Sequence, residues 1–487
     1  MGAAALEIAR AGLAGRRAWL VGGAVRDLAL GRPLADLDLV VDGDPGDAAR
    51  AVARAARAAG DPAACFALSE EFGAWRVVAR EGSWQVDVER LRGGSLEADL
   101  ALRDFTVNAV AEPLQGGAPL DPLGGLADLR AGRLRLAGPR AFEDDPLRVL
   151  RLVRVAVELD LEPEPGAMGA AREQVARLAE VSPERVFLEL QRILAAARAP
   201  RGLELMGELG ATGVVLPELD AMRGVEQSRY HHLDVYGHTL EVLDRVVALT
   251  GSDPAAPGDE HSLEALALPD EHRAQVLALL AEPLADGLTR GDALRWAALL
   301  HDAAKPATRS VRALDRRVTF IGHDLLGAEV ARDVLGRLRA SVRLREHVAA
   351  LVRHHLRLGF LVHEPQPLAR ETVFAYLRDC APVEVDVTLL SVCDRLATRG
   401  SKAQEAIDAH MALARAMLGD ALRWRRDGPP RPLLRGDELA EELDIALGPR
   451  VGELLADLAQ AQYAGAVSTR EQAIAFVREQ GSRAGAT

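Results

Sequence analysis

Cysteine is scarce in this chain, which has only Cys65, Cys380 and Cys393, far apart from one another. Three scattered thiols exclude a disulfide framework and a cysteine-rich zinc site, and they are typical of a reducing compartment. Long hydrophobic runs are also lacking, since no stretch approaches the ~20 uncharged apolar residues of a membrane span. The segment Met1–Arg17 has no signal-peptide core, so the sequence predicts a cytoplasmic protein without membrane association.

Positive charge is not in excess either. The 59 Lys+Arg against 72 Asp+Glu give a formal net charge of −13, which argues against unspecific nucleic-acid binding by a basic surface. Local basic tracks remain, because arginine greatly outnumbers lysine. One cluster comprises Arg423, Arg425, Arg426, Arg431 and Arg435. This late cluster is equally compatible with solvated helix faces and with phosphate contacts.

Short strand-like runs separated by glycine-containing turns fill the first 138 residues and predict a mixed sheet with helices. The predicted strands are Ala18–Val21, Leu37–Val41, Cys65–Leu68, Trp75–Ala79, Trp84–Leu91 and Val110–Leu114. From Phe142 onward helical periodicity dominates, with residues 251–291 expected to form an insertion or a loop between helices. The predicted fold class is therefore α+β, a mixed-sheet head followed by an all-helical remainder.

The most informative feature is a Gly22-Gly23 turn followed by Asp36 and Asp38 on a strand. Side chains two residues apart share one face of a strand, so the two carboxylates can converge on one divalent cation such as Mg²⁺. The glycines let a backbone approach phosphate oxygens closely. This combination is what nucleotidyl transfer to a hydroxyl requires. The competing interpretation is a half-exposed strand with alternating polarity.

A third carboxylate is a candidate for the same site. Asp87 lies in the strand-like run Val86–Arg90, which can pair beside the Asp36 strand. The alternative for Asp87 is a surface position on an amphipathic strand.

A helix is predicted to open at Asp144-Asp145-Pro146, with the proline in its first turn, where the missing N–H costs little. Three arginines follow on one side of this helix, namely Arg148, Arg151 and Arg154. Asp145 beside Arg148 offers the acceptors and donors needed to read a nucleobase edge by protein alone. An intrahelical ion pair between these two residues is the simpler alternative.

Together these residues resemble the class II tRNA nucleotidyltransferase and bacterial poly(A) polymerase family, a branch of the polymerase-β-like nucleotidyltransferases, over nearly the whole chain. The resemblance implies that Asp36 and Asp38 hold catalytic Mg²⁺. It implies triphosphate contacts at Gly22, Gly23 and Arg26, ribose recognition at Arg103, Asp104 and Asn108, base selection at Asp145 and Arg148, and further triphosphate contacts at Arg151 and Arg154. Arg185 and Glu189 would brace the base-selecting helix. Two positions depart from the family pattern: Leu102 replaces an arginine and Asp144 replaces a glutamate.

The product of the reaction depends on a short segment, Leu91–Asp99. Family members that add all of CCA carry a longer, flexible loop here, whereas shortening resembles enzymes that add CC and leave the final A to a partner. The resemblance therefore implies CTP or ATP as substrate, a tRNA 3′ end as acceptor, and CC addition followed by a separate A-adding enzyme. Full CCA addition, A addition and poly(A) synthesis remain alternatives.

A different set of residues lies in the helical half: His238, His301, Asp302 and Asp394 follow the order of an HD phosphohydrolase. Imidazole nitrogens mixed with carboxylate oxygens suit Mn²⁺, Ni²⁺, Co²⁺ or Zn²⁺. The accompanying residues are Lys305, His323, His354 and His355. The whole set resembles the HD domain of some tRNA nucleotidyltransferases, which implies hydrolysis of 2′,3′-cyclic or 2′-phosphates. A chain used chiefly as a phosphohydrolase, and a retained scaffold whose histidines only pack, are the alternatives.

These patterns predict four parts. They are a nucleotidyltransferase head at 1–138, a neck and base-selecting domain at 139–225, an HD domain at 226–400 and a tRNA-contacting tail at 401–487.

Overall fold

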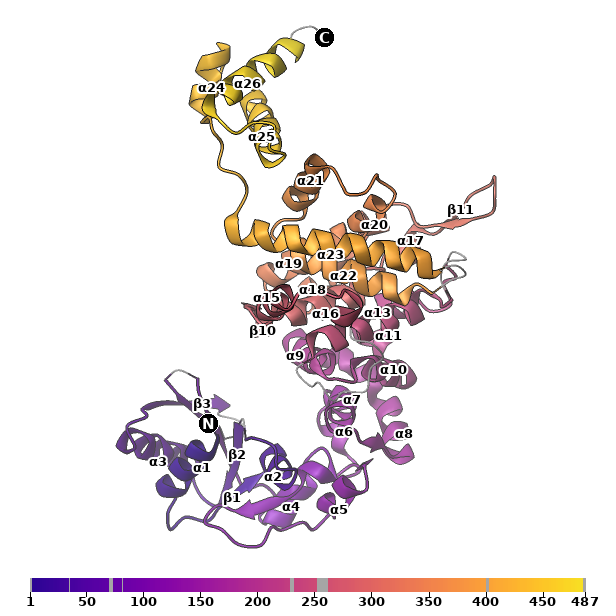
Figure 1. Cartoon of the computed structure of the whole chain (residues 1–487). Coiled ribbons are helices and arrows are strands. Elements are labelled where there is room, and N and C mark those ends of the chain that lie inside the picture. Colours follow the sequence, from indigo (N-terminus) through magenta and orange to yellow (C-terminus); the bar gives the residue numbers. More distant parts are fainter. Residues whose placement is uncertain are drawn as a thin grey trace. The chain divides into compact units, whose positions relative to one another are not determined.

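The computed structural model describes residues 2–34, 36–69, 73–80, 82–227, 232–251, 262–399 and 403–484 (Figure 1). The chain divides into two compact units. The first comprises Met1–Ile193 and Gly202–Val215, and the second comprises Leu194–Arg201 and Leu216–Thr487. The finer division into four parts stays a prediction.

The first unit contains the main sheet. Its elements up to the end of the sheet are α1 (Gly2–Gly12), β1 (Ala18–Val21), α2 (Gly23–Ala29), β2 (Asp36–Val41), α3 (Pro45–Ala58), β3 (Ala63–Ser69), β4 (Ala74–Ala79), β5 (Gln85–Arg90), α4 (Leu96–Ala101), the 3₁₀ turn η1 (Thr106–Asn108) and β6 (Ala111–Pro113). All six strands predicted from the sequence are confirmed, with ends within two residues of the predicted ones.

The six strands are ordered β3-β4-β5-β2-β1-β6. All neighbours are antiparallel except β2 and β5, which run parallel with Asp38 opposite Asp87. Alternate side chains of these two strands, such as Leu37 and Val86, are fully buried in the core formed with α1 and α3. The carboxylates therefore belong to the opposite face of the sheet.

The first unit continues as helices with one short ladder. These elements are α5 (Gly125–Arg130), β7 (Arg133–Leu134), α6 (Ala141–Asp144), α7 (Arg148–Leu159), β8 (Glu162–Pro163), α8 (Pro165–Gln174), η2 (Val175–Glu180), α9 (Pro183–Ala195), α10 (Ala199–Leu209) and α11 (Ala211–Val215). The predicted helix start at Asp144–Pro146 was wrong. Asp145 has an extended backbone between α6 and α7, and Pro146 lies in the turn before Leu147, which caps α7.

The second unit begins with helices that surround a buried polar cluster. Its elements up to α20 are α12 (Pro217–Asp220), α13 (Val235–Thr250), α14 (Ser262–Ala265), α15 (Asp270–Leu280), β9 (Pro283–Ala285), β10 (Leu288–Thr289), α16 (Arg290–Leu300), α17 (Lys305–Thr308), β11 (Ser310–Val311), β12 (Val318–Thr319), α18 (His323–Arg337), α19 (Val342–His354) and α20 (Arg357–Leu361). Helices α13, α16, α18 and α19 pack on one another and on α22 (Glu384–Ala397). None of the described helices combines the length and apolar character needed to cross a membrane.

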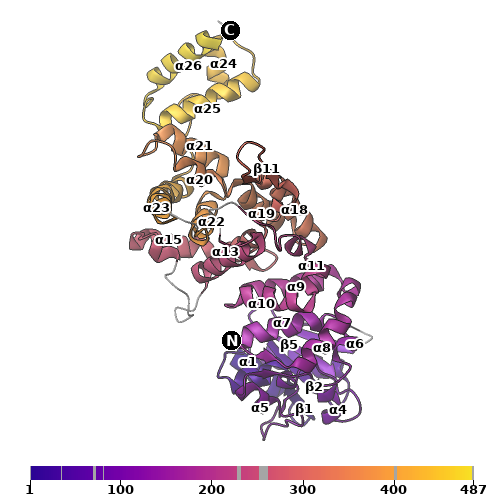
Figure 2. The same ribbon diagram turned by 90° about the vertical axis from the view of Figure 1, so that its right-hand side faces the viewer.

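The remaining helices are α21 (Arg370–Cys380), α22 (Glu384–Ala397), α23 (Ala403–Asp427), α24 (Gly436–Leu443), α25 (Pro449–Tyr463) and α26 (Arg470–Ala484). The last three form a small bundle with its own apolar core, and this bundle is seen from two sides in Figures 1 and 2. The α+β class is thus confirmed, a mixed-sheet head followed by a helical body with three two-stranded ladders.

Residues 251–291 were predicted to be an insertion or a loop, and the loop alternative was wrong for the described part. Residues 252–261 lie outside the described residues, but 262–291 contain α14, α15, the β9–β10 hairpin and the start of α16. Helix α15 buries Val276, Leu279 and Leu280, so three apolar residues at helical spacing outweigh the high content of Asp, Pro and Ala around them.

A buried ion pair stabilises the second unit. Arg290 opens α16 and donates two hydrogen bonds to Asp386 on α22, one of them at 3.1 Å from Nε to Oδ1. The guanidinium also donates to the Pro382 carbonyl at 3.1 Å, and both side chains are buried. Removing one partner of such a pair leaves an uncompensated buried charge.

We expect Asp386→Asn to destabilise the second unit by about 3–5 kcal/mol. The matched control, Glu346→Gln, removes an exposed pair with Arg332 and should cost less than about 1 kcal/mol. Hydrogen exchange of the α16 and α22 amides in the full chain measures both effects. Equal protection in the two variants would contradict a stabilising role for the buried pair.

Candidate functional site

The turn between β1 and α2 brings the backbone close to the sheet face that carries Asp36, Asp38 and Asp87, which is called the carboxylate face below. Gly22 has φ +71°, a conformation that L-residues rarely adopt. A Cβ added there would lie 3.1 Å from Oδ2 of Asp38 and 3.2 Å from Nη1 of Arg103. Glycine is therefore required both for the backbone conformation and for the space beside Asp38.

Strand pairing assembles the three candidate carboxylates. Asp38 and Asp87 are direct partners in the parallel β2–β5 ladder, and Asp36 lies on the same face of β2 two residues earlier. The predicted neighbourhood of the Asp87 strand is thereby confirmed. Arg76 on β4 donates Nε and Nη2 to the two oxygens of Asp87, each at 2.8 Å.

The surroundings of Asp38 change the protonation of its carboxyl group. The residue keeps some exposed surface, but its carboxyl group is largely surrounded by protein. This burial disfavours the charged form and raises the pKa of Asp38 to about 6. The nearby Asp87 and Glu89 add to the rise, and Arg103 opposes it. A cation between the carboxylates would offset the same repulsion.

A chain of hydrogen bonds and ion pairs links α2 to α7. Arg26 donates from Nη1 to Oδ1 of Asn108 at 2.5 Å, and Asn108 donates to Oδ1 of Asp104 at 3.0 Å. Arg151 lies 2.9 Å from Oδ2 of Asp104. Burial alone would raise the pKa of Asp104, but Arg151, Asn108 and the Phe105 amide lower it, so this carboxylate is charged.

Arg148 and Asp145 lie at the N-terminal end of α7. Arg148 donates to the carbonyls of Ala141 and Leu102, each at 3.1 Å, and its burial lowers the pKa of the guanidinium. Asp145 accepts a hydrogen bond at 2.7 Å from Arg185 on α9. The predicted bracing contact of Arg185 is therefore present.

Arg154 is held differently from the other two arginines of α7. It is buried and donates to Glu189 at 2.6 Å and to Glu158 at 2.8 Å. Glu189 also lies 4.0 Å from Arg151. This glutamate thus braces the arginine face of α7, as the sequence predicted.

Two adjoining cavities, of about 260 and 230 Å³, open on these residues. They share Asp38, Arg103, Asp104 and Arg151. The larger also contains Asp87 and Arg148, and the smaller contains the Gly-Gly turn, Asp36, Arg26, Asn108 and Arg154. Asp145 and the bracing residues Arg185 and Glu189 line neither cavity.

Among the residues that sequence reasoning missed at this site are Arg76, described above, and the pair Arg92 and Asp99. Asp99 is completely buried and accepts from Nε of Arg92 at 2.8 Å and from Nη2 of Arg103 at 3.3 Å. Arg92 and Arg103 both line the larger cavity. Arg92 and Arg103 lie seven and four residues from Asp99 in the sequence. This spacing is too common to have indicated that Asp99 holds both arginines.

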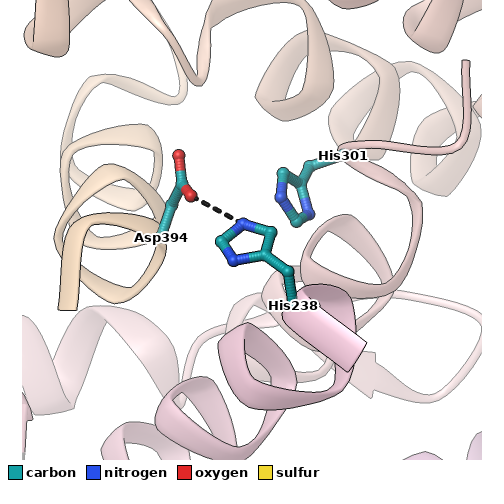
Figure 3. Close-up of side chains that lie close together, drawn as sticks. All are labelled: His238, His301 and Asp394. Carbon is teal, nitrogen blue, oxygen red and sulfur yellow. Dashed lines mark hydrogen bonds and ion pairs between the residues drawn. The ribbon is translucent and has the colours of Figure 1, made fainter. Parts of the chain in front are cut away.

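The HD residues gather from three segments of the second unit. His238 lies on α13, His301 and Asp302 follow α16, and Asp394 lies on α22 (Figure 3). Nε2 of His238 is 3.0 Å from Oδ1 of Asp394, and one ligand atom from each of His238, His301 and Asp394 lies within 4.8 Å of the others. The four predicted residues are therefore brought together.

The pKa values of the acidic and histidine side chains in this cluster depend on one another. Burial would raise the pKa of Asp302, but His301 and Lys305 hold it well below its ordinary value. Lys305 Nζ lies 2.7 Å from Oδ2 of Asp302 and donates to Gln227 at 2.7 Å. Burial also lowers the pKa of His355 to about 4, assisted by His301 and His323, so His355 is neutral.

A larger cavity of about 860 Å³ adjoins the cluster. Its lining includes Asp302, Lys305, Phe320, Phe360, Asp394 and Arg395. The volume is sufficient for a nucleotide-sized ligand, with apolar walls and a charged end.

Comparisons with known proteins agree with this division of sites. Residues 18–135 match the poly A polymerase head domain, 160–223 match the probable RNA and SrmB-binding site of polymerase A, and 270–399 match the HD domain. The head and HD domain families imply dependence on a divalent metal.

Curated relatives match along most of their length. An A-adding tRNA nucleotidyltransferase of Deinococcus radiodurans is 37% identical, over 94% of this chain and 94% of that protein. A CC-adding tRNA nucleotidyltransferase of Thermus thermophilus is 36% identical, over 94% of this chain and 93% of that protein.

Solved structures share the fold. A Thermotoga maritima CCA-adding enzyme complexed with tRNA has a TM-score of 0.58 at 18% identity, covering 98% of this chain and 95% of that one. A Bacillus stearothermophilus CCA-adding enzyme in complex with CTP has a TM-score of 0.59 at 23% identity, covering 99% and 98%.

The raised pKa of Asp38 predicts proton release when a divalent ion binds. Below about pH 6 the carboxyl is protonated and must lose its proton to become a ligand, so binding should weaken as the pH falls. Calorimetric Mg²⁺ titrations in buffers of different ionisation enthalpy count the released protons. We expect most of one proton at pH 5.5, almost none at pH 7.5, and none at either pH in Asp38→Asn. Equal release in the wild type at both pH values would contradict the assignment to Asp38.

Proposed function

Since the chain belongs to the tRNA nucleotidyltransferase family, we propose that its head adds the two cytidylates of the 3′-terminal CCA to tRNA and leaves the final A to a separate enzyme. The reaction transfers CMP from CTP to the 3′-hydroxyl of the acceptor end and releases pyrophosphate. We place it in the cytoplasm, and we propose that the tail at 401–487 contacts the body of the tRNA.

The observation that carries CC specificity is the turn after β5. Residues 91–95 are all that separate β5 from α4. Gly93 and Gly94 have φ of +67° and +80°, and the Ser95 side chain caps α4 by accepting from the Ala98 amide at 3.2 Å. Such a turn is too short to change the base pocket from one that binds cytosine to one that binds adenine.

Buried contacts hold this turn in place. Asp99 accepts from both the backbone N–H and Nε of Arg92, at 3.2 and 2.8 Å. Arg92 is thereby fixed at the wall of the larger cavity, next to Arg103. We propose that a pocket with fixed walls accepts one base only, because a single arrangement of donors and acceptors cannot match both bases.

The carboxylate face suits Mg²⁺. Asp36, Asp38 and Asp87 supply oxygen ligands, which this cation prefers. The pKa of Asp38 is raised mainly by burial and further by the nearby Asp87 and Glu89, and a bound cation would offset both effects. When bound, Mg²⁺ supplies charge stabilisation for the reacting phosphate and lowers the pKa of the attacking hydroxyl. Arg76 orients Asp87 through its two hydrogen bonds.

The other predicted head residues bind the nucleotide in this proposal. Gly22, Gly23, Arg26 and Arg151 face the triphosphate, and the linked Arg103, Asp104 and Asn108 recognise the ribose. Arg154 is already paired with two glutamates, so a triphosphate would compete with them for it.

Base selection is assigned to Arg148 and Asp145. Arg148 lines the larger cavity, and two carbonyls fix its guanidinium. Asp145 contributes next to it, with Arg185 holding the carboxylate.

A second activity is favoured by the HD cluster. We propose that His238, His301, Asp302 and Asp394 bind a transition-metal ion, for which mixed nitrogen and oxygen donors are suited, and that the adjoining cavity admits a 2′,3′-cyclic or 2′-phosphate. Lys305 would contact the phosphate from the cavity wall.

Neutral replacement of a metal-facing carboxylate tests the transferase. Asp38→Asn removes a charge that holds the cation, so CMP incorporation into tRNA lacking its 3′ end should fall at least about 1,000-fold. Asp42→Asn, on an exposed position just after the same strand, should stay within about twofold. Full incorporation by Asp38→Asn would rule out the proposed reaction centre.

Product sequencing tests the CC specificity separately. Pure protein is incubated with tRNA lacking CCA and with tRNA ending in CC, each with CTP and ATP together. We expect the first substrate to stop at CC and the second to remain unextended. A complete CCA end, addition of A to the second substrate, or a long A tail would overturn CC specificity and identify the activity instead.

A further inference from the structure

A hairpin rich in arginine adjoins the cavity of the second unit. Strands β11 and β12 pair through Ser310 with Thr319 and Val311 with Val318, and Figure 1 shows that the hairpin extends away from the helices. We call residues 309–319 the basic arm. Every residue from 309 to 317 is exposed, so these side chains are accessible to a partner.

The charge of the basic arm is mostly of one sign. Residues 309–317 contain four arginines and only one acidic residue, Asp315. Asp315 lies 3.0 Å from Arg312 and 3.1 Å from Arg317, so its single charge is shared between two guanidinium groups. Arg309 and Arg316 have no ion pair with any described residue. In a chain with a net charge of −13, this local excess of positive charge suits a polyanion.

The arginine cluster at 423–435 differs from the basic arm. An ion pair with an acidic side chain is made there by each of Arg423, Arg425, Arg426 and Arg435. Most of that positive charge is therefore compensated, which favours solvated helix faces for the late cluster. The basic arm keeps its charge available for phosphate.

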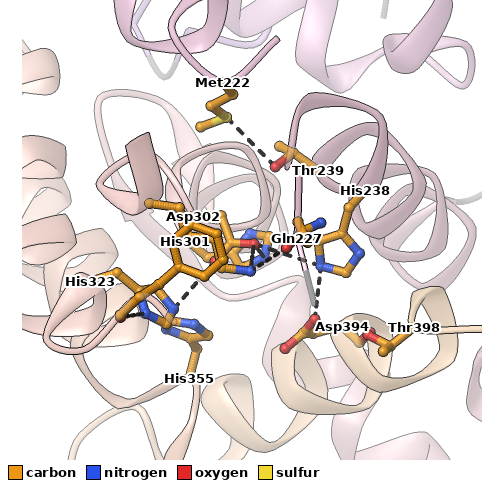
Figure 4. A network of polar contacts seen from close by, with 12 residues as sticks. Met222, Gln227, His238, Thr239, His301, Asp302, His323, His355, Asp394 and Thr398 are labelled. Atoms are coloured by element: carbon orange, nitrogen blue, oxygen red, sulfur yellow. Dashed lines mark hydrogen bonds and ion pairs between the residues drawn. The ribbon is translucent and has the colours of Figure 1, made fainter. Parts of the chain in front are cut away.

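The base of the arm forms part of the cavity wall. Residues 318–321 line the cavity of about 860 Å³, so β12 leads from the arginines to the mouth of the cavity. Arg317 and Phe320 are three residues apart, a span of at most about 11 Å in an extended chain. Nζ of Lys305 lies 5.4 Å from the ring centroid of Phe320, and beyond it lies the polar network drawn in Figure 4.

Exposed apolar side chains lie at the mouth of this cavity. Phe360 on α20 is 66% exposed, Ile321 is 86% exposed and Leu325 on α18 is 51% exposed, and all three line the cavity. Apolar side chains exposed together at one opening are typical of a site that meets a partner. An exposed phenyl ring offers a face on which an unpaired base can stack, and nearby guanidinium groups suit the phosphates that flank such a base.

We propose that the basic arm and the apolar mouth of the cavity form a binding surface for single-stranded RNA. Arg309 and Arg316 contact phosphates, and Phe360 stacks on a base. A duplex fits this surface less well, because its bases are stacked on one another and leave no free face for Phe360. The surface is separate from the transferase head, and the inference requires neither of the two reactions proposed above.

Photo-cross-linking in the full chain tests the proposal. The probe is a short oligouridylate that carries one 4-thiouridine, and the cross-linked peptides are identified by mass spectrometry. We expect cross-links in peptides from the basic arm or around Phe360, in addition to any in the head. The yield of these peptides, measured against probe concentration at several KCl concentrations, gives the affinity of this surface alone.

Two variants and a matched control separate charge from stacking. Arg309→Ala/Arg316→Ala should lower the slope of log affinity against log salt by about 1.4, since each phosphate contact on a single strand contributes about 0.7. Phe360→Ala should weaken binding at least about fivefold and leave the slope unchanged, because stacking is uncharged. The control, Arg343→Ala/Arg378→Ala, removes two exposed arginines outside the cavity lining and should change neither quantity.

Cross-links confined to the head or the tail would overturn the surface as a whole. An equal loss of slope in the two double variants would mean unspecific attraction by charge and refute the assigned arginines. Full affinity in Phe360→Ala would refute the stacking contact. Equal affinity for a blunt RNA duplex of the same length would overturn the preference for a single strand.

Discussion

The parallel pairing of β2 with β5 is the constraint on which the head depends. In a sheet whose other neighbours are antiparallel, this one ladder places Asp38 opposite Asp87. Residues alternating with the carboxylates, such as Leu39 and Val88, are buried beneath α1 and α3, so a shift by one residue would move the carboxylates into the core. The energy of the hydrophobic core thus fixes the register of a repulsive pair of acidic groups.

Acidic residues also position the arginines of the head. The protein has a net charge of −13, yet the cavities beside Asp38 are rich in guanidinium groups. Asp99 holds Arg103, and Asp104 holds Arg151, in each case from a buried position. An arginine held in this way loses little further freedom when it meets a phosphate, which favours binding by preorganisation rather than by bulk attraction.

The sequence predicted those parts of the structure that are encoded locally. Strand alternation and glycine turns located all six strands of the main sheet, and the motifs located many of the residues that line the two cavities beside Asp38. The start of α7 was misplaced, because a proline tolerated in a first turn is equally suited to the turn before it. The role of Asp99 could not be foreseen, since its contacts with Arg92 and Arg103 depend on how the chain turns between them.

The HD cluster illustrates a different limit. Its order of His and Asp residues was recognisable, but the contacts of Asp302 with His301 and His323 through different oxygens are a property of side-chain geometry. His355 faces the cluster, whereas its neighbour His354 lies outside it. The sequence shows two adjacent histidines and does not indicate which of them faces the cluster. His355 keeps helical backbone angles, so its side chain points about 100° around the helix axis from that of His354 and donates from Nδ1 to the Val352 carbonyl at 2.6 Å. The rotation between consecutive helical positions therefore decides which of the two histidines lines the cluster.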